Sequence, residues 1–173
     1  MRVGITLIQE EFYYMSLFQI KYDFDTEALK QELLSVRDQF ESYTDDRLDF
    51  DMNNWLILRS KESLPVLNEE CDRFRWDHGL YKNQIKPRYY VLESDTVLPQ
   101  HVDFNTRCSI NHILSEDNAD VMFGQDTFSY KTALLDTTQP HGVDNTDKPD
   151  RLLFKLSFFD ISYNNVKKLL TLT

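Results

Sequence analysis

After residue 87 the chain consists of short apolar or alternating runs, and this pattern constrains its fold more than any other feature. Alternating runs of this length are typical of half-buried strands. Turn-forming residues such as Gly124 and Pro140 separate them. Seven or eight short strands at this spacing predict a sandwich or a barrel. The runs cover residues 88–92, 100–104, 108–114, 120–123, 129–135, 142–145 and 152–159.

The first half of the chain has a different hydrophobic pattern, which predicts two helices. Residues 16–24 alternate and predict a strand, and Asp25 or Thr26 then caps a helix that runs to about residue 40. A short strand at 55–58 precedes a second helix at 65–76, which ends near Gly79. Residues 164–170 form either a short helix or an unstructured tail. A strand and two helices before a run of strands predict the α+β class with a jelly-roll-like core.

Length and composition favour a single globular domain over residues 1–173, in which residues 1–86 support a core formed by residues 87–160. The 19 basic and 29 acidic side chains give a net charge of −10. This charge argues against a broad nucleic-acid surface but leaves room for a local cationic pocket. Two cysteines are too few for a disulfide framework, and no apolar run approaches a membrane span or a signal-peptide core. We therefore expect a cytoplasmic protein.

The triplet His101-Val102-Asp103 is the first candidate for chemistry. On a strand, residues i and i+2 point to the same face, so one imidazole and one carboxylate reach the same point. A distant histidine would complete the two-His-one-carboxylate set that binds Fe(II) and leaves positions open for a cofactor and O2. The triplet alone is a weak signal, because chance supplies roughly 0.4 of them in a chain of this composition.

A second segment strengthens the interpretation. His141 follows a predicted strand and turn, and Arg151 lies ten residues later, where an apolar strand begins. A guanidinium inside a barrel needs an anionic partner, and a dicarboxylate cofactor supplies one in a geometry that suits the guanidinium. The alternative is an arginine at the rim that pairs with Asp144, Asp147 or Asp150.

These residues carry a family resemblance. The stretches LPQHVDFNTRCSINHIL (98–114) and YKTALLDTTQPHGVDNTDKPDRLLFKLSF (130–158) resemble the double-stranded β-helix core of 2-oxoglutarate/Fe(II)-dependent dioxygenases. The most similar members are small, aspartyl/asparaginyl β-hydroxylase-like proteins of phage and marine microbes. Four features occur in the same order: the HxD triplet, an Ile-Asn after it, a Leu-Asp before the distal histidine, and His-x10-Arg.

The resemblance implies an enzyme with named parts. His101, Asp103 and His141 would bind Fe(II), and Arg151 would bind the far carboxylate of 2-oxoglutarate. Arg107 and Asn111, four residues apart on one predicted strand, would contact the cofactor's other end, the iron or the substrate, or else form a structural hydrogen-bonded pair. With O2, such an enzyme hydroxylates an unactivated C–H bond of a peptidyl Asp/Asn or of a small polar substrate.

The chain also departs from its relatives. Many members have a serine two residues after the cofactor arginine, where this chain has leucine, so Tyr89, Tyr90 or Ser157 is expected to supply the missing hydroxyl. Asp136 is expected to orient His141 or Arg107. The remaining imidazoles, at positions 78 and 112, are interpreted as structural or surface groups. The alternatives to the enzyme are a non-catalytic jelly-roll protein that binds a ligand or a partner, and a cupin-like isomerase, whose sites usually carry more histidines.

Overall fold

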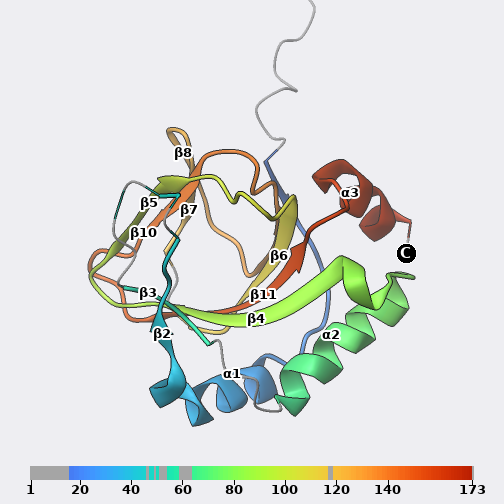
Figure 1. Cartoon of the computed structure of the whole chain (residues 1–173), viewed down its shortest axis with the longest axis horizontal. Coiled ribbons are helices and arrows are strands. Elements are labelled where there is room, and N and C mark those ends of the chain that lie inside the picture. The colour runs from blue at the N-terminus through green and yellow to red at the C-terminus, as the bar shows by residue number, and fades with distance from the viewer. Residues whose placement is uncertain are drawn as a thin grey trace, which may run out of the picture.

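A computed structural model describes residues 16–45, 47, 48, 50, 54–58, 64–116 and 119–172, and in this part of the chain two antiparallel sheets face each other (Figure 1). The larger sheet has the order β1 (Leu17–Gln19), β9 (Thr132–Leu135), β6 (Cys108–Ile113), β11 (Arg151–Phe158), β4 (Ile85–Leu92), β3 (Trp55–Ile57) and β2 (Glu41–Ser42). The smaller sheet has the order β5 (Val97–His101), β10 (His141–Asp144), β7 (Val121–Phe123) and β8 (Asp126–Phe128). This arrangement confirms the predicted α+β class with a jelly-roll, double-stranded β-helix core.

Strand β11 separates two cores. Its even-numbered residues, such as Phe154 and Phe158, belong to the core on the helix side of the larger sheet. Leu153, on the opposite face, packs in the core between the two sheets. Arg151, Lys155 and Ser157 share that face, because side chains of a strand alternate with a period of two. Every polar side chain of β11 therefore points to the space between the sheets.

Helices α1 (Thr26–Ser35) and α2 (Pro65–Asp77) cover the outer face of the larger sheet (Figure 1). The carboxylate of Asp25 accepts a hydrogen bond from the Ala28 amide at 3.0 Å and caps α1, as predicted. Glu32 on α1 accepts hydrogen bonds from the Val66 and Leu67 amides, both at 2.8 Å, and from the Tyr89 hydroxyl at 2.9 Å. One carboxylate thus ties both helices to β4.

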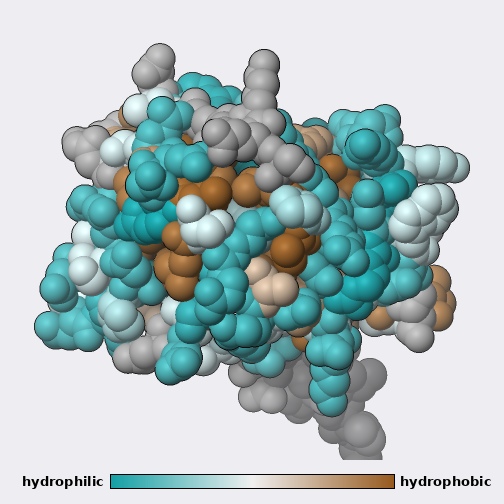
Figure 2. Space-filling model, turned by 90° about the horizontal axis from the view of Figure 1, so that it is seen from below, coloured by the Kyte–Doolittle hydropathy of each residue, from teal (hydrophilic) through white to brown (hydrophobic). Residues whose placement is uncertain are grey.

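The outer surface on this side is mainly hydrophilic, with apolar side chains showing in separate spots (Figure 2). A third helix, α3 (Tyr163–Thr171), follows β11, so the last segment is helical and not a tail. Within the described residues, no helix combines the length and the apolar character needed to cross a membrane.

Several predicted boundaries were wrong. The first helix ends at Ser35 and gives way to a 3-10 turn at Arg37–Gln39, and the strand expected at 16–24 is only three residues long. The strand expected at 100–104 ends at His101, because the Asp103 amide bonds the Thr137 carbonyl instead of a strand partner. Strand β8 was missed altogether. The short apolar run at residues 3–8, which is too short for a signal-peptide core, lies outside the described residues.

Gly142 allows β5 and β10 to approach closely. A Cβ atom at this position would lie 2.6 Å from the Leu98 carbonyl oxygen and 3.0 Å from the Gln100 amide nitrogen. Both neighbours are backbone atoms, so a side chain would force the two strands apart. Because His141 and His101 are direct partners in this pairing, the glycine also sets the distance between the two imidazoles.

We predict that Gly142→Ala destabilises the protein more than Gly124→Ala. At Gly124 a Cβ meets nothing within 4 Å, and the cost comes only from its φ of +61°, about 1–2 kcal/mol. At Gly142 no such φ cost applies, and the whole cost comes from backbone atoms of β5 that must move, which we place at the upper end of about 1–3 kcal/mol or above it. Urea unfolding of the two variants measures the difference. Equal stability of both variants would show that β5 and β10 are not held in this close contact.

Candidate metal centre

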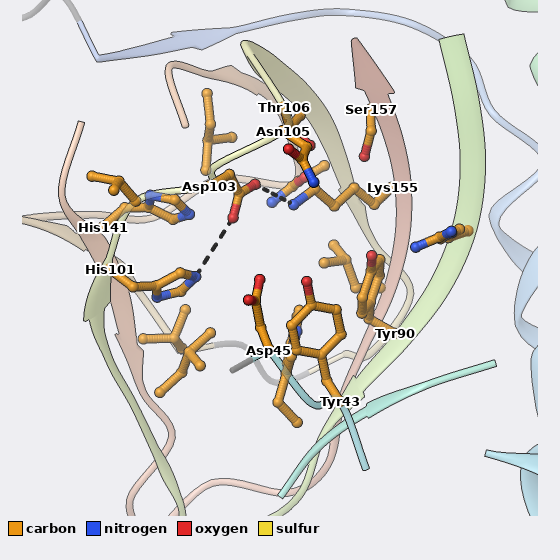
Figure 3. A pocket seen from close by; sticks show the side chains of 18 of the residues that line it. Tyr43, Asp45, Tyr90, His101, Asp103, Asn105, Thr106, His141, Lys155 and Ser157 are labelled. Atoms are coloured by element: carbon orange, nitrogen blue, oxygen red, sulfur yellow. Dashed lines mark hydrogen bonds and ion pairs between the residues drawn. The ribbon is translucent and has the colours of Figure 1, made fainter. Parts of the chain in front are cut away.

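Three potential metal ligands meet at one end of the smaller sheet. His101 ends β5, Asp103 lies in the loop after it, and His141 begins β10. One donor atom from each residue lies within 4.8 Å of the others, and His101 Nε2 is 3.7 Å from Asp103 Oδ1. Figure 3 shows both imidazoles and the carboxylate directed toward a common space. The structure therefore brings together the three residues that the sequence analysis singled out, although Asp103 is not on a strand.

Backbone carbonyls orient both imidazoles. His101 Nδ1 lies 2.9 Å from the Pro99 carbonyl oxygen, and His141 Nδ1 lies 2.9 Å from the Gln139 carbonyl oxygen. A carbonyl only accepts, so each Nδ1 carries the proton and each Nε2 keeps its lone pair for a metal. Asp136, which was expected to orient His141 or Arg107, instead accepts two hydrogen bonds from Thr138 within its own turn.

Burial gives these groups the charge states that metal binding requires. Desolvation lowers the pKa of His101 and lowers that of His141 to about 4, so both imidazoles are neutral near pH 7. Burial raises the pKa of Asp103, but the charge of Lys155 and the hydrogen bond that Lys155 donates outweigh it and bring the pKa below its usual value. Two neutral imidazoles and one ionised carboxylate match the facial set that non-haem Fe(II) prefers.

Lys155 is the site residue that sequence reasoning missed. It reaches across from β11 and places its Nζ 3.0 Å from Asp103 Oδ2, opposite the two histidines (Figure 3). Burial lowers the pKa of Lys155, but the carboxylate of Asp103 outweighs it, so the ammonium stays charged. The signal in the sequence was a lysine inside an apolar strand, four residues after Arg151 and therefore on the same face.

Arg151 lies inside the protein, at only 2% exposure, so the rim alternative is wrong. Its guanidinium donates to the Ala119 carbonyl and, at 2.8 Å, to the Tyr130 hydroxyl, whose ring it also overlies. Tyr130 thus contributes the hydroxyl beside the arginine that was expected from Tyr89, Tyr90 or Ser157. The Tyr89 hydroxyl is bonded to Glu32 on the helix side of the sheet.

A cavity of about 230 Å³ connects these groups. Asn111 lines it, accepts a hydrogen bond from Ser109 at 3.0 Å and donates to Tyr130 at 3.4 Å. Arg107 is exposed, precedes β6 and does not line the cavity. The structure therefore brings Arg107 neither to the predicted contact with the cofactor, the iron or the substrate nor to the alternative pairing with Asn111. The site side chains that line the cavity are Tyr43, Tyr90, His101, Asp103, Asn111, Tyr130, His141, Arg151, Leu153, Lys155 and Ser157.

The two remaining histidines lie away from this centre. His112 is buried under α1, with Nε2 at 2.9 Å from the Thr26 hydroxyl and Nδ1 at 2.7 Å from the Thr132 hydroxyl. His78 packs edge-on against Phe74, with ring centroids 4.4 Å apart. Both imidazoles pack as structural groups, in agreement with the prediction.

No protein-family model and no curated protein matches the chain. Solved structures match it in fold, among them a prolyl hydroxylase from Trichoplax adhaerens in complex with a hypoxia inducible factor oxygen degradation domain peptide fragment. That structure has a TM-score of 0.60 at 15% identity, over 92% of this chain and 88% of its own. A Pseudomonas putida prolyl-4-hydroxylase has a TM-score of 0.58 at 13% identity, and the match covers 84% of this chain and 94% of that structure. AviO1 from Streptomyces viridochromogenes Tue57 has a TM-score of 0.52 at 12% identity, and the match covers 84% of this chain and 90% of that structure. At these identities the likeness shows a common fold.

We predict that the chain binds one Mn(II) or Fe(II) ion and that His101→Ala weakens binding at least about tenfold, because one of three ligands is lost. Anaerobic calorimetric titration with either ion measures the affinity. His112→Asn is the matched control, since it removes an imidazole that the donor set does not use. If His101→Ala binds the ion as tightly as the wild-type protein, the donor set is misassigned.

We also predict that the metal-free protein loses stability as the pH falls below 6.5. Burial lowers the pKa of His112 and of His141 to about 4, so the unfolded chain takes up protons that the folded chain refuses. Each histidine then contributes about 1–2 kcal/mol between pH 7 and pH 5. Urea unfolding at several pH values measures the free energy of unfolding, and its slope against pH should be shallower for His112→Asn than for the wild-type protein. An unchanged slope against pH would contradict the buried neutral state of His112.

Proposed function

We propose that the chain is an Fe(II)- and 2-oxoglutarate-dependent dioxygenase that hydroxylates an unactivated C–H bond. The observation that carries the proposal is a facial set of metal donors in the same cavity as a buried arginine. His101, Asp103 and His141 would hold the metal through two Nε2 atoms and one carboxylate oxygen. Arg151 would bind the far carboxylate of the cosubstrate, because its fork-shaped guanidinium suits a carboxylate and Tyr130 holds it in place.

Iron and 2-oxoglutarate, when bound, would supply the oxidising power through their reaction with O2. The residues of the chain would orient the bound groups and keep water away from them. The Pro99 and Gln139 carbonyls keep both Nε2 atoms aimed at the metal. Tyr90 and Leu153 lie side by side on β4 and β11 between the Arg151 end and the Lys155 end, and they give the cavity an apolar wall. Such a wall excludes water from the path between metal and arginine.

The size of the cavity limits the substrate. A volume of about 230 Å³ is smaller than the range of about 300–1,000 Å³ that is common for sites of drug-sized ligands. Once the cosubstrate has taken its share, room remains for a small polar molecule or for a single side chain of a peptide. One fold neighbour holds a peptide fragment, which supports the peptide option for a cavity of this architecture.

Anaerobic addition of Fe(II) and 2-oxoglutarate should give the weak visible charge-transfer band of the chelate. We predict that His101→Ala abolishes the band and that Arg151→Gln raises the 2-oxoglutarate concentration for half-maximal signal at least about tenfold, since a bidentate charged contact is lost. Arg107→Gln is the matched control, because Arg107 is exposed outside the cavity.

The band also separates this proposal from a non-catalytic binding protein. With O2 admitted, an enzyme of this class forms succinate even without its primary substrate, and the binding protein forms none. A wild-type protein that binds Fe(II) but gives neither band nor succinate would refute the cofactor assignment.

A further inference from the structure

Positive charge gathers at the end of the cavity opposite Arg151. Lys86 and Arg88 lie two residues apart on β4, so both point to the cavity face of the sheet, and both line the cavity. Arg88 is the direct cross-strand neighbour of Lys155 on β11, and Lys86 is the neighbour of Ser157. Three cations and one hydroxyl therefore occupy two adjacent rows of the larger sheet.

Two of these cations have no protein partner among the residues that the structure describes. Within the part of the chain that the structure describes, neither Lys86 nor Arg88 makes a hydrogen bond or an ion pair, although acidic residues outnumber basic ones by 29 to 19. By contrast, Arg47 across the cavity is neutralised by two hydrogen bonds to Asp45, at 2.6 and 2.7 Å. The two charges repel each other, and this repulsion by Arg88 lowers the pKa of Lys86 below its usual range. Two adjacent like charges without a counter-ion favour binding of an external anion.

The distance along the sheet separates this cluster from the arginine that the cosubstrate would use. Lys155 is four residues after Arg151, about 13 Å along the strand. The apolar row of Tyr90 and Leu153 lies between the two ends. The candidate metal ligands lie at the Lys155 end, where Asp103 bonds Lys155. An anion on Lys86 and Arg88 would thus sit near the metal but not in the place of the far cosubstrate carboxylate.

We propose that Lys86 and Arg88 form an oxyanion subsite at the cavity mouth that binds a carboxylate or phosphate group of the primary substrate. The assignment to the primary substrate rests on the proposed function, whereas the anion site itself does not. Arg88 is half-buried and Lys86 is exposed, so the subsite is open to a ligand that enters from solvent. Ser157, opposite Lys86 in the register, is placed to donate a further hydrogen bond to the same oxyanion.

The test is an NMR titration of the full-length, metal-free chain with propionate, methyl phosphate and the neutral isostere propionamide. Propionate and methyl phosphate should give saturable shifts at the amides of Lys86, Arg88 and Ser157, and propionamide should give none. The double variant Lys86→Gln/Arg88→Gln should weaken both anions at least about tenfold, while the charge-retaining Lys86→Arg/Arg88→Lys should stay within about threefold.

A matched charge-removing variant locates the effect. Lys82→Gln/Lys167→Gln removes two charges outside the cavity and should change none of the anion affinities. Equal binding of propionamide, or unaltered anion affinity in Lys86→Gln/Arg88→Gln, would overturn the subsite.

The outcome can be read independently of the proposed function. If the Fe(II)–2-oxoglutarate band forms in the wild type and in Lys86→Gln/Arg88→Gln, but the double variant binds propionate and methyl phosphate as the wild type does, only the subsite proposal fails. If anions bind through this pair but the wild type gives no band, the oxyanion site stands and the dioxygenase proposal fails. For an active enzyme, loss of the pair should raise KM for an acidic substrate and leave succinate formation in the absence of primary substrate unchanged.

Discussion

The ion pair between Asp103 and Lys155 spans the interior and links the loop after β5 to the larger sheet. Moving two charges out of water costs free energy, which their attraction offsets only at short distance. Separating the pair would leave an uncompensated buried charge, which is strongly destabilising. The pair therefore fixes the loop beside the cavity that lies between the sheets. Because Asp103 is held there, its other oxygen comes within 3.7 Å of His101. The cavity and the convergence of the donor atoms both depend on this pairing.

The packing of strand β11 in the helix-side core holds the site residues on its other face in place. Phe154 is fully buried between Phe24 and Tyr89, and its neighbours on the strand point the opposite way into the cavity. Close packing leaves such a side chain little freedom, so the backbone that carries Arg151 and Lys155 is held equally well. Two cations about 13 Å apart are thereby set on a rigid element rather than on a loop. The proposed function, in which Arg151 would bind a carboxylate at a set distance from a metal, needs this kind of support.

The alternating runs predicted the sheets, and the spacing of His101 with Asp103 and of His141 with Arg151 singled out residues that line one cavity. The reason given for the first pair was wrong, because Asp103 lies in a loop and its contact with Lys155, not strand spacing, places its carboxylate. Lys155 and Tyr130 were missed for a physical reason. Strand β11 is covered on both faces, so its apolar residues do not alternate with polar ones and hide which face a lysine occupies. The contact of Tyr130 with Arg151 joins residues 21 positions apart through tertiary packing, which no local pattern encodes.

Charge and depth together imply an order of entry. Arg151 is buried at the far end, Lys155 is nearly buried beside the candidate ligands, and Lys86 is exposed at the mouth. Under the two proposals, a substrate held by Lys86 and Arg88 would lie between solvent and Arg151. The cosubstrate would then have to bind before the substrate. The net charge of −10 adds to this selection, because the surface repels large polyanions while the cationic interior accepts small ones. Under the two proposals, the cavity would hold two acidic ligands at different depths.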